Sequence, residues 1–132
     1  MAEKGFLVTG HDHLGHGGSI RTRADYGYFA QPDGNRAVLD DLHAVTALTK
    51  QLYPGVPYFL LGHSMGSFYA RQYLCEWGSE LSGAIIMGTG FQPKALVQLA
   101  KTICRVLAVF FGWQHRSKLV ASLSFTGYNK GL

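Results

Sequence analysis

The sequence predicts an α/β fold, a parallel sheet with flanking helices, and two observations lead to this prediction. Apolar runs recur at residues 5–9, 58–61 and 83–87, and segments with helical spacing follow the first two. Strands that alternate with helices form parallel sheets. All three runs are continuously apolar rather than alternating, which is typical of strands covered on both faces. We therefore expect three parallel strands with helices on both faces of the sheet.

Local signals predict the elements in order. Gly5–Thr9 is the first expected strand, and the polar, glycine-rich residues 10–34 predict a loop with turns. Asp33 is a preferred helix N-cap residue, and Gly78 is expected to end the helix after the second strand. The helix after Asp33, ended by the prolines and glycine at 54–57, has apolar residues at helical spacing. These predict its buried face: Val38, Leu42, Val45, Leu48 and Leu52.

The most informative segment is the pentapeptide Gly62-His63-Ser64-Met65-Gly66. It lies between the second strand and a helix, so a serine stands at the apex of a tight turn. Small flanking residues let strand and helix approach closely, and the turn exposes the serine hydroxyl above the sheet edge. The Met65 N–H would begin the helix, where it can donate to a developing oxyanion. We predict Ser64 as a catalytic nucleophile and the Met65 backbone as its oxyanion donor.

Three loops are expected to meet at this turn. In parallel sheets the ligand crevice lies beyond the carboxyl ends of the strands. Residues 11–19, the Ser64 turn and residues 88–92 each follow a predicted strand. Beside the serine, we predict that His63, Gly90 and Phe91 contact the substrate.

The character of the chain changes at Pro93. Residues 93–113 are mostly apolar, but Lys101 and Arg105 interrupt them on one helix face. A membrane-spanning helix needs about 20 apolar residues with few charges, so spanning is not expected. A lid over an apolar pocket, peripheral contact with a membrane surface, and an ordinary core-covering helix all stay open. We divide the chain into a core segment, 1–92, and a lid or cap segment, 93–132.

Composition excludes some functions. The formal net charge is +4 without a dense Lys/Arg cluster, so nucleic acid is not an expected partner. No acidic residue occurs after Glu80. The two cysteines, Cys75 and Cys104, have no motif spacing, and no signal peptide is visible, which predicts a reducing, cytoplasmic location.

Three segments carry a family resemblance: Asp12–Ser19, Tyr58–Tyr69 and Gly83–Gly90. They resemble the α/β-hydrolase superfamily, specifically the group of monoacylglycerol lipases, lysophospholipases and serine aminopeptidases. The resemblance covers most of residues 1–130 and implies a partial α/β-hydrolase fold with the start of an inserted helical cap. It also implies a Ser–Asp–His triad, in which Ser64 attacks an ester carbonyl and a histidine carries the proton to the leaving alcohol.

The triad acid and histidine are not found in this chain. In this fold both follow the serine along the sequence. No aspartate follows Ser64, Glu76 lies about 18 Å further along the helix, and His115 falls in the lid segment. We therefore expect an internal piece of a larger hydrolase, without efficient esterase activity by itself.

The predicted function is hydrolysis of carboxylic esters such as monoacylglycerols or lysophospholipids, through an acyl-enzyme on Ser64. The alternatives are a lipid- or partner-binding module with a vestigial turn and a peptidase of the same fold. A metal site is a further rival, because four metal-ligand residue types lie close together: His11, Asp12, His13 and His16. Their glycine-rich loop supplies no clear further ligands, so we expect neither a metal nor a cofactor.

Overall fold

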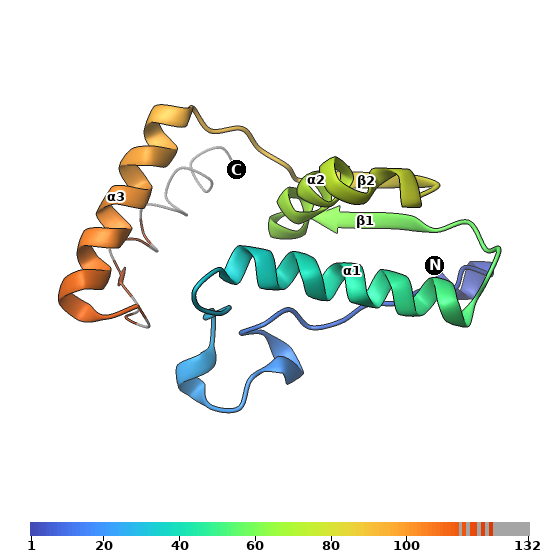
Figure 1. The fold of residues 1–132 in the computed structure, drawn as a ribbon, viewed down its shortest axis with the longest axis horizontal. Coiled ribbons are helices and arrows are strands. Elements are labelled where there is room, and N and C mark those ends of the chain that lie inside the picture. The colour runs from blue at the N-terminus through green and yellow to red at the C-terminus, as the bar shows by residue number, and fades with distance from the viewer. Residues whose placement is uncertain (114, 116, 119, 121, 123–132) are drawn as a thin grey trace. The chain divides into compact units, whose positions relative to one another are not determined.

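The computed structural model describes residues 1–113, 115, 117, 118, 120 and 122. The chain forms two compact units, Met1–Gly90 and Phe91–Leu132. The long elements of the first unit are α1 (Gly34–Leu52), β1 (Phe59–His63), α2 (Met65–Trp77) and β2 (Gly83–Met87), and α3 (Lys94–Phe111) belongs to the second unit (Figure 1).

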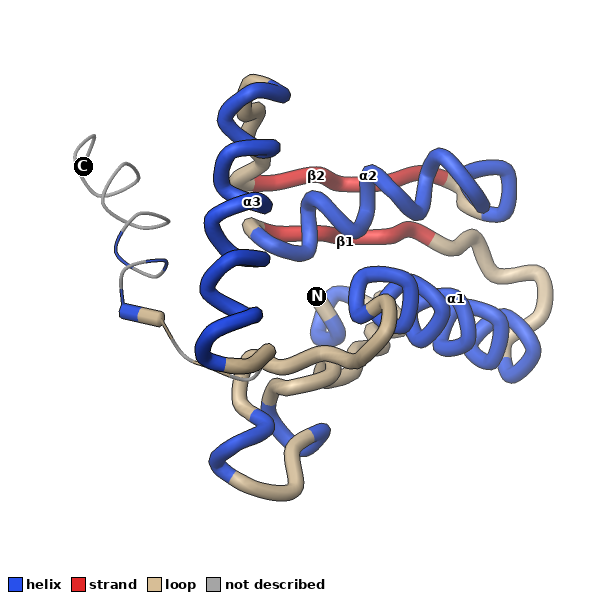
Figure 2. The backbone as a smooth tube through the Cα atoms, turned by 60° about the vertical axis from the view of Figure 1, so that its left-hand side comes forward, coloured by secondary structure: helices blue, strands red, loops and turns tan. Residues whose placement is uncertain are grey.

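The sheet of the first unit consists of β1 and β2, which run parallel with Phe59 opposite Gly83 and His63 opposite Met87. Helix α2 contacts both strands and lies along them in Figure 2. It ends at Trp77 with Gly78 as its C-cap. The predicted order of strand, turn, helix and strand is thus confirmed over residues 59–87.

The hydrophobic core lies between the helices and one face of this sheet. Helix α1 contacts α2, and the core residues come from α1, β1 and α2: Val38, Leu39, Leu60, Tyr69, Ala70 and Tyr73. Tyr73 and Val38 are fully buried. Both helices therefore gather on the Leu60 face of the sheet.

The opposite sheet face is not covered by a helix of the first unit. Along β1, Leu60 and Gly62 are buried while the alternate residues Phe59 and Leu61 are exposed. On β2, Ile85 and Met87 are also close to half exposed, at 46% and 48%. The expectation of helices on both faces is therefore wrong for this part of the chain. Both faces of these strands carry apolar side chains, as expected, but the helices of the first unit pack on only one of them.

The expected strand at Gly5–Thr9 is also wrong. A short 3₁₀ helix occupies Ala2–Lys4, and Gly5–Thr9 has no regular structure. Phe6, Leu7 and Val8 are 63%, 50% and 57% exposed. A strand needs a neighbour for its backbone N–H and C=O groups. Among the described residues, no strand pairs with Gly5–Thr9. This segment therefore does not form a strand, although its sequence is apolar.

Helix α1 begins as predicted, but its buried face differs. The Arg36 N–H donates to Asp33 Oδ1 at 3.0 Å, which confirms the N-cap. Leu48 and Leu52 are exposed, at 56% and 63%, whereas Thr46 and Thr49 are buried. The two threonine hydroxyls donate to the backbone carbonyls of residues 42 and 45, at 2.9 and 2.8 Å. A threonine that satisfies its hydroxyl within the helix can take a core position.

Candidate active site

Ser64 occupies the sharp turn between β1 and α2, with φ 52° and ψ −116°. It is the one described non-glycine residue with a positive φ. Such a conformation costs about 1–3 kcal/mol and persists where its surroundings hold it. Here the Ser64 N–H donates to the Met87 carbonyl at 3.0 Å, and its own carbonyl accepts from the Ser67 N–H at 3.0 Å. Ser64 itself is exposed, so the turn presents its hydroxyl at the surface.

The two glycines that bracket the serine have different roles. A Cβ on Gly62 would collide with the Gly66 carbonyl oxygen and lie 2.8 Å from the Ala70 Cβ. A Cβ on Gly66 would meet no atom within 4 Å. The predicted close approach of strand and helix therefore requires a glycine at 62, whereas the structure leaves room for a side chain at 66.

Met65 is the first residue of α2. The first N–H groups of a helix have no acceptor within the helix and lie at the positive end of its dipole. An N–H in this position can stabilise negative charge that develops on a substrate oxygen. The position of Met65 suits the predicted oxyanion donor, and the role itself stays a prediction.

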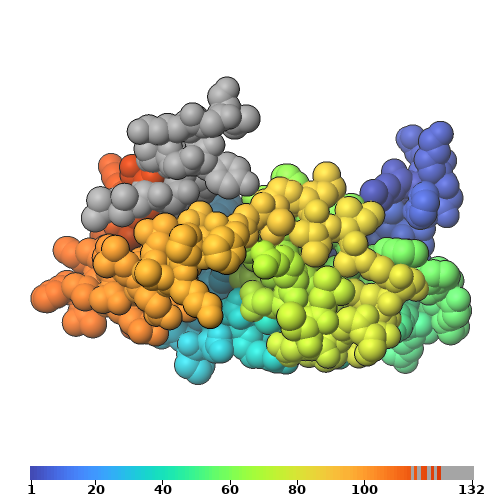
Figure 3. Space-filling view, turned by 90° about the horizontal axis from the view of Figure 1, so that it is seen from above, coloured from blue at the N-terminus to red at the C-terminus, as the bar shows by residue number. Residues whose placement is uncertain are grey.

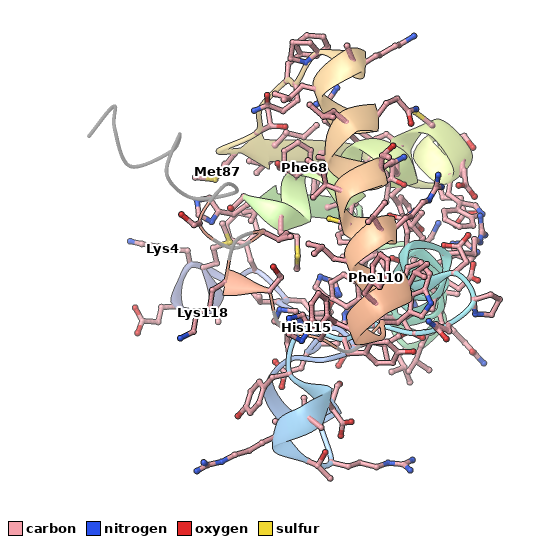
Figure 4. The ribbon with its side chains drawn as sticks, turned by 90° about the vertical axis from the view of Figure 1, so that its left-hand side faces the viewer. Lys4, Phe68, Met87, Phe110, His115 and Lys118 are labelled. Carbon is pink, nitrogen blue, oxygen red and sulfur yellow. The ribbon has the colours of Figure 1, made fainter. Side chains whose placement is uncertain are left out.

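The loop after β2 lies against the serine turn. A Cβ on Gly88 would be 3.4 Å from the His63 ring and 3.5 Å from the Ser64 nitrogen. The Arg71 guanidinium donates to the Gly90 carbonyl at 3.3 Å, which ties this loop to α2. This hydrogen bond joins α2 to the loop after β2. In Figure 4, Phe68 marks α2 and Met87 marks the end of β2. His63 therefore adjoins the turn, and Gly90 is tethered to the helix that the turn begins.

Phe91, the third predicted substrate contact, belongs to the second unit and is 81% exposed. Its contact with substrate stays a prediction, as do those of His63 and Gly90.

The loop of residues 11–19 packs on the side of α2. The His13 ring lies 5.7 Å from the Tyr69 ring, and the His16 ring stacks on Phe29 at 5.8 Å between centroids. The Asp12 carboxylate accepts the Gly18 N–H at 2.7 Å. These contacts fix the loop on the core, and none of them is with Ser64.

The histidines of this loop are close to each other. The His11 and His13 rings are 4.9 Å apart, and the buried atoms His11 Nε2 and His13 Nδ1 have no hydrogen-bond partner among the described residues. Burial lowers the pKa of His13, and the neighbouring His11 and His16 lower it further. In the part of the chain that the structure describes, no group of three or more His, Cys, Asp or Glu side chains could hold a metal ion.

The acids that follow Ser64 are engaged elsewhere. Glu76 pairs with Arg36 at 2.6 Å, and Glu80 lies 3.9 Å from Lys50. His115 stacks on Phe111 within the second unit. Among the described residues no histidine hydrogen bonds to Ser64, so the contacts of this site come from the turn, α2 and the β2 loop.

Two residues of this region were missed in the sequence. Ser67 and Arg71 both contact the turn or its neighbouring loop from α2. Ser67 follows the nucleophile by three residues, and a hydroxyl at that spacing is a signal that sequence reasoning could have used. Arg71 gave no such signal, because its contact with Gly90 joins segments distant in sequence.

Comparison with known proteins places the chain in one family. The family described as serine aminopeptidase, S33, matches residues 1–128. The chain belongs to this family of α/β-hydrolases.

Within this family, the curated proteins that the chain resembles are monoglyceride lipases. The chain is 36% identical over 108 residues to a monoglyceride lipase homolog of Monkeypox virus, which covers 75% of this chain and 34% of that protein. It is 35% identical over 89 residues to human monoglyceride lipase, covering 61% of this chain and 25% of the lipase. The chain therefore spans a quarter to a third of the length of these relatives. No solved structure matches it.

Proposed function

We propose that this chain carries the nucleophile of a serine hydrolase that cleaves carboxylic esters of the monoacylglycerol or lysophospholipid class. The observation that carries the proposal is the exposed Ser64, held at φ 52° directly before the N-terminus of α2. This is the strand–turn–helix context that the serine motif requires. The family and the similarity to monoglyceride lipases support the same reaction.

The reaction is an acyl transfer. Ser64 Oγ attacks the ester carbonyl, its proton passes to a general base, and the Met65 N–H donates to the oxyanion that forms. The base then gives the proton to the leaving alcohol, and water hydrolyses the acyl-serine. The family resemblance assigns the base to a histidine, with an aspartate to orient it.

A fluorophosphonate probe tests the nucleophile directly, because it modifies activated serines. We expect labelling of the peptide that contains residue 64, and its loss in Ser64→Ala. Ser79→Ala, which removes a serine just beyond the end of α2, is the matched control and should label like the parent protein. The assay is run on the 132-residue chain and on the longest protein whose reading frame contains it. Absence of labelling in the latter would exclude the hydrolase and favour a binding module.

Substrate class is tested on the longest protein whose reading frame contains this chain. We expect turnover of a monoacylglycerol and of a lysophospholipid, and none in Ser64→Ala. An aminoacyl p-nitroanilide is the competing substrate, because the family name is that of an aminopeptidase. Faster release of p-nitroaniline than of fatty acid would replace the esterase proposal with the peptidase.

We also propose that residues 93–113 contact a membrane surface peripherally. The basic residues of α3 stand at helical spacing along one side of the helix, called here the basic line: Lys94, Lys101 and Arg105. The opposite line is apolar and consists of Leu96, Leu99, Ile103, Val106 and Phe110. None of the residues of α3 is buried, and Phe110 is 77% exposed. Atoms of α3 (orange) lie at the surface of the face that Figure 3 shows. No described helix is long and apolar enough to cross a bilayer. A basic helix with an apolar line suits the boundary of an anionic membrane.

Neighbouring residues of α3 provide a matched test of this contact. Phe110, labelled in Figure 4, stands on the apolar line, and Val109, equally exposed at 78%, stands toward the basic line. We expect sedimentation with phosphatidylcholine–phosphatidylserine vesicles to fall about tenfold in Phe110→Ser and to change little in Val109→Ser. Equal effects of the two substitutions would contradict the proposed orientation.

The two cysteines of the chain are free thiols, and both are exposed. Exposed free thiols suit a reducing compartment, and we propose that the protein is cytoplasmic.

A further inference from the structure

Ser67 lies beneath the serine turn and has not been assigned a role. Ser67 is fully buried, at 0% exposure, in the first turn of α2. Its Oγ donates to the Ser64 carbonyl oxygen at 2.5 Å, and its backbone N–H donates to the same oxygen at 3.0 Å. One carbonyl thus accepts two hydrogen bonds from one residue.

This carbonyl belongs to the peptide group that contains the proposed oxyanion donor. The peptide between Ser64 and Met65 is planar and trans, so its C=O and N–H point in opposite directions. Any group that holds the Ser64 oxygen on one side therefore sets the direction of the Met65 N–H on the other. Hydrogen bonds to the oxygen also polarise the peptide and strengthen its N–H as a donor.

A single hydrogen bond to the Ser64 oxygen would leave this peptide plane more room to rotate. The Ser67 N–H approaches the oxygen from the helix backbone, and the hydroxyl approaches it from the side chain. Two donors at different positions restrict the rotation of the plane more than one can. The other end of Ser64 is fixed as well, because its N–H donates to the Met87 carbonyl at 3.0 Å.

We infer that Ser67 is a positioning residue, whose buried hydroxyl aims the Met65 N–H at the oxyanion by holding the Ser64–Met65 peptide plane. The inference rests on the proposed function of Ser64 and Met65. Ser67 does not touch the substrate, and it acts only through this peptide.

The test compares two reactions at residue 64. In the variant Ser64→Cys, p-nitrophenyl acetate acylates the thiolate through a tetrahedral oxyanion and releases p-nitrophenolate. Iodoacetamide alkylates the same thiolate, with loss of iodide, and no oxyanion forms. The ratio of the acylation rate to the alkylation rate, measured by mass spectrometry of the peptide that contains residue 64, therefore reports oxyanion stabilisation. The exposed thiols of Cys75 and Cys104 are internal references, because both residues lie beyond the first turn of a helix, where the backbone N–H groups bond within the helix rather than to a substrate oxygen.

In Ser64→Cys, we expect the ratio at position 64 to exceed that at Cys75, and to fall by about three- to tenfold when Ser67→Ala is added. Ser67→Ala keeps the backbone N–H, so the Ser64 carbonyl retains a donor and the fold should persist. Thr46→Val is the matched control. It also removes a fully buried hydroxyl that donates to a backbone carbonyl, yet it lies in α1 and should leave the ratio unchanged.

The outcomes separate this inference from the function on which it rests. A ratio at position 64 no higher than at Cys75 would mean that this position has no oxyanion donor, which removes that part of the proposed function together with the role of Ser67. A high ratio that Ser67→Ala leaves unchanged would overturn the role of Ser67 alone. If Ser67→Ala does not fold, Ser67→Thr, which keeps the hydroxyl, should hold the ratio within about twofold of the parent; a larger drop would overturn the inference.

Discussion

Gly62, where β1 passes close to α2, is the position for the most informative stability variant, Gly62→Ala. The new Cβ would lie 2.8 Å from both the Ala70 Cβ and the Gly66 carbonyl carbon. Carbon atoms in contact prefer about 3.5–4.0 Å, so the helix must move by several tenths of an ångström or more. Overpacking of this kind costs about 1–3 kcal/mol, which is a large share of the stability of a small domain. In urea unfolding followed by circular dichroism, we expect the midpoint to fall by about 1 M.

Gly66→Ala is the matched variant, because it adds the same methyl group to the other glycine of the turn. This Cβ would meet no atom within 4 Å, and the residue lies in the first turn of α2. Alanine is a better helix former than glycine by about 1 kcal/mol, so the midpoint should stay constant or rise. If Gly66→Ala lowers the midpoint as much as Gly62→Ala does, the explanation by close approach is wrong.

Three further predictions concern the loop and the α1–α2 contact. The free energy of unfolding of the parent protein should decrease below pH 6.5, and in His13→Gln this decrease should be smaller, as measured by urea unfolding at several pH values. Burial lowers the pKa of His13, so the unfolded state binds the proton first, and stability is lost as pH falls through about 6.5; an unchanged slope would contradict this. Arg36→Lys should lower the thermal midpoint, because lysine cannot reproduce bonds to Asp40 and Glu76 together with the stacking on Trp77 at 5.2 Å; an unchanged midpoint in low salt would refute it. Tyr73→Phe should cost about 0.5–1.5 kcal/mol in urea unfolding, since it removes the 3.1 Å bond to His43 Nδ1, and a more stable variant would show that this bond is dispensable.

Predictions that depended on neighbours in the sequence were largely right. The N-cap at Asp33, the strands predicted at 58–61 and 83–87, and the turn at Ser64 all follow from residues within a few positions of each other. The structure places the first of these strands at 59–63. Caps, tight turns and the switch from strand to helix are local interactions, so the residue types that make them are visible in the sequence.

Predictions that depended on distant partners failed or were incomplete. Gly5–Thr9 is as apolar as a strand but has no described neighbour to pair with, and one apolar face of the sheet is not covered by either helix of the first unit. The inward face of α1 includes Thr46 and Thr49, because packing against α2 and the sheet decides which side of a helix is buried.

By itself, the sequence determined where the chain turns and which serine stands at the apex, because glycine and serine chemistry over five residues is sufficient for that. Only the tertiary structure decided how that serine is held. Three contacts hold it, and each joins residues that are separated along the chain. They are the hydrogen bond from the Ser64 N–H to the Met87 carbonyl, the close approach of Gly62 to the Ala70 methyl group, and the hydrogen bond from Arg71 to the Gly90 carbonyl. Such contacts form when β1, β2 and α2 pack together, and no local pattern encodes their distances.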